Sequence, residues 1–301
     1  MPKFLRSVLQ KNGTAEQAVF QVETVELEPP PAGHIQVKVS KAGVAFADVL
    51  QRLGLYPGVP KGKVTLGYDL VGTITAVGSG VSNYAIGDRV VALTVWSAHQ
   101  QYVNIPAEGP GRGDSFTPKG GRGRLALVPM TCSSVSDEKL VSLVLNYVTA
   151  YQMMFRSAKL HQETTRSLRR TQVILVHGAA GGVGTAMLQL ASVYGIRCIG
   201  TASAGKHDLV RRLGGDPVDY SKKAWVEEVA RLAGPEGVEA VFDPVGGSTT
   251  DTSYKVLRKN GAMVVLYRLF VLAGCAAGLT RGHTCRCSLV PPACTHVSRA
   301  S

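Results

Sequence analysis

Acidic residues are scarce in this chain. Its 301 residues include 21 Asp and Glu against 33 Lys and Arg, which gives a formal net charge of +12 and a pI near 9.5. Such an excess raises the question of a nucleic-acid or acidic surface partner. Eight of the twelve net positive charges lie in three segments, residues 107–124, 161–170 and 267–301, so the remainder is only mildly basic. Because no basic helix interleaved with aromatic residues is present, a nucleic-acid partner is not expected.

A disulfide framework and a targeting segment are also missing. Of the six cysteines, Cys132 and Cys198 lie far apart and the other four crowd into the tail. Residues 1–10 lack the apolar core of a signal peptide, so a cytoplasmic location is expected. Residues 262–279 form one apolar run, but Arg268 near its middle would cost about 2.5–3.5 kcal/mol to insert into a bilayer. Membrane association is therefore not expected, and a tail anchor is the alternative.

The most informative stretch is QVILVHGAAGGVGTAMLQLA, residues 172–191. An apolar run over residues 173–176 predicts a strand, and the apolar spacing after the glycines predicts a half-buried helix. A strand, a glycine-rich turn and a helix in this order are typical of a dinucleotide site, in which the pyrophosphate lies on the helix start. A structural turn is the alternative. The expected cofactor-binding residues here are Gly178, Gly181, Gly182, Val183 and Gly184.

The next strand end indicates which dinucleotide binds. About 20 residues beyond the loop, a chain built for NAD places an acid against the ribose 2′-hydroxyl. This chain has no acid in residues 198–206. Ser203 and Lys206 are instead suited to hold a 2′-phosphate by hydrogen bonding and charge, so NADP is favoured over NAD. Lys206 as a solvated residue that opens the next helix is the alternative.

The pattern of the chain changes near residue 135. Before it, short β-like runs at residues 35–39, 70–77, 89–93 and 101–105 alternate with turn signals, which predicts an antiparallel barrel-like domain. After it, strands at residues 173–176, 197–199, 240–242 and 263–266 alternate with helices at residues 208–213 and 224–232. This alternation predicts an α/β domain with a doubly wound parallel sheet.

Several ordered motifs resemble one family. GVAFADVLQRLGLYPG, LGYDLVGTITAVGSGVSNYAIGDRVVAL, LNYVTAYQ, VHGAAGGVG, TASAGKH and FDPVGG follow one another between Phe4 and Leu266. They resemble the zinc-independent medium-chain dehydrogenases/reductases, in particular the quinone oxidoreductase branch that includes the synaptic-vesicle membrane protein type. The resemblance implies a GroES-like β-barrel substrate domain, a Rossmann NADP-binding domain and an active site in the cleft between them.

The resemblance also implies that no catalytic zinc is bound. Zinc-dependent relatives read Gly-Val-Cys-His and Gly-His-Glu where this chain has Ala45, Phe46 and Tyr68 at the ligand positions. Alanine and phenylalanine are not zinc ligands, and a tyrosine replaces the ligand histidine. The four-cysteine loop of structural zinc is absent as well. An alternative zinc site in the tail, with the tight Cys285 and Cys287 spacing, does not match standard structural sites.

Without zinc, the implied reaction is hydride transfer from NADPH to a quinone or to an α,β-unsaturated carbonyl such as an enone or enal. By resemblance the candidate catalytic residues are Tyr56, which faces the nicotinamide cleft, and Asp48. Tyr56 orients the acceptor oxygen or relays a proton, and packing beside Pro57 in the turn is the alternative. Asp48 is either polar machinery near the site or a strand-to-helix cap.

By resemblance, further cofactor-binding residues are Asn146 and Thr149, in the segment that touches the nicotinamide, Tyr220, beside the 2′-phosphate, and Asp243, in the nicotinamide groove. Each has a structural alternative. Thr149 is also compatible with a hydrogen bond to its own helix, Tyr220 with covering the sheet edge and Asp243 with capping the next turn. His177 is interpreted as a core or loop histidine.

The chain departs from the family after Leu266. Residues 267–301 match none of the expected continuation, and we expect them to be an atypical, poorly structured tail that lacks the strand through which relatives form homodimers. The expected domains are residues 1–130, with a loose insert at 108–123, and residues 131–266. Two alternatives to the reductase follow: an NADPH-binding protein with impaired catalysis, and a membrane- or partner-associated relative.

Overall fold

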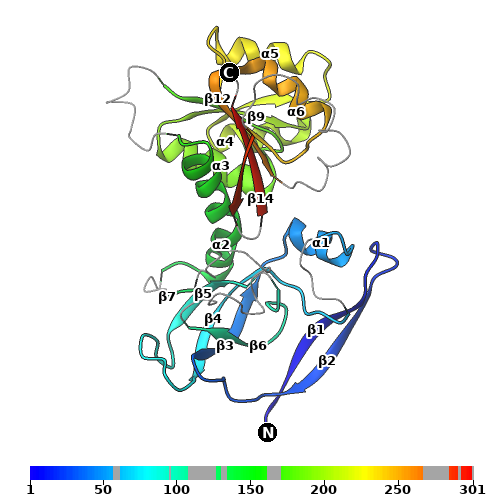
Figure 1. Ribbon diagram of the computed structural model, residues 1–301, viewed down its shortest axis with the longest axis vertical. Coiled ribbons are helices and arrows are strands. Elements are labelled where there is room, and N and C mark those ends of the chain that lie inside the picture. Colours follow the sequence, from blue (N-terminus) through cyan, green and yellow to red (C-terminus); the bar gives the residue numbers. More distant parts are fainter. Residues whose placement is uncertain are drawn as a thin grey trace. The chain divides into compact units, whose positions relative to one another are not determined.

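A computed structural model describes residues 1–56, 62–94, 96–107, 127–129, 134–160, 171–266, 285–290 and 293–299. The chain divides into two compact units, residues 1–145 and 146–301 (Figure 1). This division falls inside a helix, Asp137–Tyr151, whereas the sequence places the domain boundary at residue 130. Each unit is described by itself.

The N-terminal unit is built from antiparallel strands and one short helix. Its elements are β1 (Lys3–Lys11), β2 (Val19–Glu26), β3 (His34–Ala42), α1 (Phe46–Arg52), β4 (Asp69–Val77), β5 (Arg89–Leu93), β6 (Tyr102–Pro106) and β7 (Leu127–Pro129). β1 and β2 form a two-stranded sheet, and the other five form a sheet in the order β6-β3-β4-β5-β7. Alternate apolar residues of these strands, such as Ile35, Val37 and Ile105, fill one buried cluster. The predicted antiparallel GroES-like domain is confirmed.

The C-terminal unit alternates strands and helices along the chain. Its elements, with the helix that leads into it, are α2 (Asp137–Tyr151), the π-helix η1 (Gln152–Ser157), β8 (Val173–Val176), α3 (Gly182–Val193), β9 (Arg197–Ala202), η2 (Ala204–Lys206), α4 (His207–Arg212), β10 (Gly215–Asp219), α5 (Trp225–Ala233), β11 (Val238–Asp243), α6 (Ser248–Ser253), η3 (Tyr254–Val256), β12 (Leu257–Leu266), β13 (Cys285–Val290) and β14 (Ala293–Arg299).

These strands form one sheet in the order β10-β9-β8-β11-β12-β14-β13. The first five are parallel, and the chain crosses from β10 at one edge to β11 beside β8. The strand order therefore reverses at β8, and the carboxyl end of a strand at such a point is where open α/β sheets bind ligands. The predicted doubly wound Rossmann sheet is confirmed.

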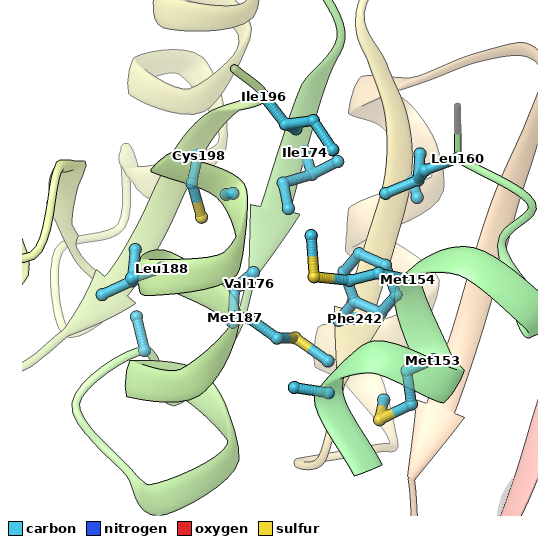
Figure 2. Close-up of a cluster of buried hydrophobic side chains, with 14 of the residues drawn as sticks. Met153, Met154, Leu160, Ile174, Val176, Met187, Leu188, Ile196, Cys198 and Phe242 are labelled. Atoms are coloured by element: carbon cyan, nitrogen blue, oxygen red, sulfur yellow. The ribbon is translucent and has the colours of Figure 1, made fainter. Parts of the chain in front are cut away.

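Two apolar cores cover the two faces of this sheet. Ile174 and Val176 of β8 face a cluster with α3 and η1, in which Met153, Met154, Met187 and Phe242 meet (Figure 2). The intervening Leu175 faces a second cluster with Val229 of α5. Because a parallel strand between two helical layers is apolar on both sides, the continuous run VILV fits β8.

Two segments of the tail, which the sequence predicted to be poorly structured, are strands in the structure. β14 pairs antiparallel with β12, from Ala262 opposite Arg299 to Leu266 opposite Thr295, and β13 pairs with β14. The edge of β12 offers a row of backbone N–H and C=O groups, and a strand of almost any sequence can pair with such an edge. Composition alone therefore did not reveal these strands.

The apolar run at residues 262–279 begins inside β12, and its part beyond Leu266 lies outside the described residues. The inserts at 108–123 and 161–170 also lie outside them, as does Pro57. Within the ranges that the structure describes, no helix has both the length and the apolar character needed to cross a membrane.

The first core predicts the stability of the C-terminal unit. Met187 is 1% exposed between β8 and η1, so Met187→Ala leaves a cavity and we expect it to lower the free energy of unfolding by about 2–5 kcal/mol. Val193 ends the same helix and is 73% exposed, so Val193→Ala should change it by no more than about 0.5 kcal/mol. Urea unfolding measures both values, and equal losses would show that α3 is not packed as described.

Candidate functional site

The turn after β8 is shaped by its glycines. Gly178 has a φ of +63°, in the left-handed region that glycine adopts without steric cost. A Cβ at Gly184 would overlap the carbonyl oxygen of Gly178 and lie 2.7 Å from Cα of Ala179. Only a glycine therefore allows the first turn of α3 to pack this closely on the loop.

The start of α3 is open to a ligand. Gly181 is the N-cap residue, and Gly181 and Gly182 are exposed. The first N–H groups of a helix have no partner within it, and their partial positive charge attracts anions. A Cβ at Gly182 would lie 2.8 Å from Oδ1 of Asn146, so the structure brings Asn146 of α2 against this helix start. Helix, loop and amide together form a site of the right chemistry for a pyrophosphate.

The carboxyl ends of β9 and β10 lie side by side. Ala202 pairs with Asp219 in the parallel register, so the next residues, Ser203 and Tyr220, leave the sheet at the same level. Ser203, Tyr220 and Lys206 of η2 are exposed. The only described acid at these two strand ends is Asp219, whose Oδ1 accepts hydrogen bonds from the N–H and the hydroxyl of Ser221. The three residues predicted to bind the 2′-phosphate are therefore all exposed at the ends of these two neighbouring strands.

Asp243 at the end of β11 is fully buried and holds a turn. Its Oδ1 accepts hydrogen bonds from the N–H groups of Val245, at 2.7 Å, and Gly246, at 3.1 Å, and its Oδ2 accepts one from the Thr250 hydroxyl. This geometry matches the capping alternative. Thr149 is half-buried on α2, one helical turn after Asn146.

In the N-terminal unit, Asp48 ties two loops together. Its Oδ2 accepts a hydrogen bond from the N–H of Ala45 at 2.7 Å, and its Oδ1 one from the N–H of Gly67 at 3.0 Å. Burial raises the pKa of this carboxyl against those two bonds. With both oxygens engaged by backbone, the geometry favours the capping alternative over direct chemistry.

Tyr56 forms a pair that the sequence did not predict. Its hydroxyl oxygen lies 2.5 Å from that of Tyr68, the residue at the zinc-ligand histidine position, and the two rings meet edge to face. Both side chains are buried. A phenol that receives a hydrogen bond keeps its own proton to donate, and its phenolate is stabilised after the proton leaves. The spacing of twelve residues between the two tyrosines gives no sequence signal for this contact.

Asp69 is the other residue that sequence reasoning missed. Its Oδ2 accepts a hydrogen bond from the N–H of Leu145, and its buried Oδ1 has no hydrogen-bond partner among the described residues. Burial, reinforced by the charge of Asp48, raises the pKa of Asp69 to about 6. An acid in the first position of a buried strand was the available signal, because an unpaired buried carboxylate is costly.

Family models match both units. Residues 31–131 match the alcohol dehydrogenase GroES-like domain, and residues 182–266 match the zinc-binding dehydrogenase domain. The description of the second domain mentions zinc, but Ala45, Phe46 and Tyr68 offer neither a thiolate nor an imidazole at the ligand positions. Fold and glycine loop together define a two-domain dehydrogenase/reductase.

Individual relatives narrow this class. The chain is 35% identical over 269 residues to a synaptic vesicle membrane protein VAT-1 homolog of Rattus norvegicus, which covers 89% of this chain and 60% of that protein. It is 28% identical to a probable quinone oxidoreductase of Schizosaccharomyces pombe, with 85% and 70% covered. The chain thus spans about 60% of the length of the VAT-1 homologs of rat, mouse and human.

Solved structures agree. The Escherichia coli quinone oxidoreductase complexed with NADPH has a TM-score of 0.69 at 29% identity, with 86% of this chain and 72% of that chain covered. The human VAT-1 homolog-like protein has a TM-score of 0.68 at 27% identity, with 86% and 71% covered. The chain belongs to the medium-chain dehydrogenases/reductases and is quinone oxidoreductase-like.

The buried carboxyl of Asp69 predicts a pH dependence. Its pKa is about 6 in the folded protein against an ordinary 3.8, so the folded state holds the proton more tightly and loses stability as the pH rises through this window. The free energy of unfolding of Asp69→Asn, relative to that of the parent chain, should therefore rise by about 3 kcal/mol between about pH 4 and about pH 7. Urea unfolding across this range measures the difference. Asp208→Asn, at a side chain that is 84% exposed, is the control, and a flat difference for Asp69→Asn would contradict the assignment.

Proposed function

We propose that this chain binds NADPH and reduces a quinone or an α,β-unsaturated carbonyl without zinc. One observation carries the proposal: the open start of α3 and the exposed Ser203, Lys206 and Tyr220 lie at the carboxyl edge of the same parallel sheet. β8, which leads into α3, and β9 and β10 are consecutive strands of that sheet. NADPH needs two anion-binding points at this edge, one for its pyrophosphate and one for its 2′-phosphate.

The phosphate on the ribose decides between the two nicotinamide cofactors. A 2′-phosphate would be attracted by the ammonium group of Lys206 and hydrogen-bonded by the hydroxyl of Ser203. β9 ends without an acid that would bind a free 2′-hydroxyl, and the carboxylate of Asp219 is engaged by Ser221. The comparison with an NADPH complex of E. coli quinone oxidoreductase supports this choice.

Bound NADPH would supply the hydride, and the protein would supply position and a proton. Reduction of a quinone or an enone also requires a proton on oxygen or carbon. We assign this proton to the hydroxyl of Tyr56, with Tyr68 stabilising the phenolate that remains. Asp48 holds the α1 segment through Ala45 and Gly67 and does not itself donate the proton. The relationship to a probable quinone oxidoreductase supports a small-molecule acceptor.

A second candidate is a protein that binds NADPH but does not turn over. The dehydrogenase model matches only to Leu266, and from there the chain continues into the segment that ends in β13 and β14. This divergence leaves the glycine loop and the ends of β9 and β10 unchanged. Protection from heat by NADPH, without NADPH oxidation by any quinone or enone, would favour this candidate.

Lys206 provides a test of cofactor choice. Lys206→Ala removes the cation that we assign to the 2′-phosphate, so the Kd for NADPH should rise about tenfold while that for NADH changes by less than about twofold. Thermal shift and fluorescence titration measure both constants. Lys255→Ala, at an exposed lysine of η3, is the matched control. Equal weakening of both cofactors by Lys206→Ala would contradict the assignment.

The tyrosine pair provides a test of turnover. Tyr56→Phe should lower kcat for a simple quinone or enone by about a hundredfold, because it removes the proton donor, and leave the Kd for NADPH unchanged. Tyr68→Phe should lower kcat by about tenfold, because it removes the hydrogen bond that supports the Tyr56 phenolate. Tyr102→Phe keeps its edge contact with Phe4 and serves as the control. The activity should withstand a metal chelator, and an unchanged kcat for Tyr56→Phe would remove the tyrosine from the mechanism.

A further inference from the structure

His177 lies between β8 and the glycine loop and is 2% exposed. Its Nδ1 is 2.9 Å from the hydroxyl oxygen of Thr201, and its Nε2 is 2.8 Å from that of Ser253. The Ser253 hydroxyl also donates a hydrogen bond to the carbonyl oxygen of Thr249 at 2.7 Å. A buried imidazole therefore links the end of β9 to α6.

These contacts fix the direction of every hydrogen bond. Ser253 has one hydroxyl proton and gives it to Thr249, so it accepts from His177, and Nε2 carries the imidazole proton. Nδ1 then accepts from the Thr201 hydroxyl. Burial lowers the pKa of His177 to about 4, against the attraction of Asp243, so the ring is neutral as this order requires. The result is a chain of hydrogen bonds, which we call the relay, that runs from Thr201 through His177 and Ser253 to the carbonyl oxygen of Thr249.

The backbone of the same residues carries the glycine loop. The N–H of His177 donates to the carbonyl oxygen of Phe242 at 2.9 Å, and the N–H of Ala179 donates to that of Thr201 at 3.0 Å. The loop is thus tied to β11 on one side and to β9 on the other. The rings of Trp225 and His177 meet edge to face, with their centroids 5.4 Å apart.

We infer that His177 is a positioning residue of the proposed dinucleotide site, whose relay holds the glycine loop and the Ser203 segment in the conformation that receives the two phosphate groups. This inference rests on the proposed function for its ligand. Thr201 is the point at which both are held, because its hydroxyl bonds the imidazole, its carbonyl bonds the loop, and Ser203 follows two residues later. If His177 only filled space, cofactor binding would depend on the shape of its side chain and not on the hydrogen bond that Thr201 donates to it.

Thr201→Val and Thr201→Ser separate the two roles. Valine keeps the volume of threonine and removes the donor, which leaves Nδ1 buried without a partner, and serine restores the donor. We expect Thr201→Val to raise the Kd for NADPH about tenfold and Thr201→Ser to return it to within about threefold of the parent chain. Thr252→Val on α6, outside the relay, is the control and should leave the Kd unchanged. An unchanged Kd for Thr201→Val, or no recovery with Thr201→Ser, would overturn the inference.

A measurement without cofactor keeps this test separate from the proposed function. Amide hydrogen exchange at Ala179 should be faster in Thr201→Val and return to the parent rate in Thr201→Ser, and the imidazole nitrogen shifts should show the Nε2–H form. If the parent chain does not bind NADPH but this exchange pattern is found, the proposed function falls while the role of the relay stands. Equal exchange at Ala179 in both variants would overturn the role of the relay whatever the cofactor result.

Discussion

The structure of the C-terminal unit depends on how closely α3 approaches the sheet. A Cβ at Gly184 would overlap the carbonyl of Gly178, and a Cβ at Gly200 would lie 2.7 Å from the Cβ of Ala179. The helix start can therefore reach the carboxyl end of β8 only while these positions have no side chain. The same approach exposes Gly181 and Gly182, where a phosphate needs bare N–H groups. Close packing and phosphate binding therefore both require glycine in this part of the sequence.

A glycine loop gains no rigidity from its own side chains, so its neighbours must supply it. Asp243 fixes the turn that leads into α6, and His177 connects that helix to β9. Both side chains are buried, and both ring nitrogens of His177 and both carboxylate oxygens of Asp243 take part in hydrogen bonds. Such bonds offset the cost of burying polar groups. The candidate cofactor site is therefore shaped from behind by polar groups that need not touch the cofactor.

The sequence was sufficient for the four adjacent strands β9, β8, β11 and β12 and for the glycine loop, because their signals are local. The run VILV, the glycine spacing and the strand at residues 89–93 each carry their own pattern, and the structure has them at the predicted residues. The contacts of Tyr56, Asp69 and His177 could not be predicted, since each joins segments that only the fold brings together. The hairpin of the tail was missed because backbone pairing to an edge strand leaves little trace in composition.

The N-terminal unit shows how a dehydrogenase fold balances charge without metal ligands. In zinc-dependent relatives, a divalent cation would be the largest charge near such acids. Here Ala45, Phe46 and Tyr68 provide no ligand, yet Asp48 and Asp69 remain buried nearby and repel each other. Backbone N–H groups satisfy Asp48, while one oxygen of Asp69 has no hydrogen-bond partner among the described residues and its pKa is raised. Burial and the charge of Asp48 thus raise the pKa of Asp69 to about 6, and Tyr68 stands at the position of the imidazole ligand.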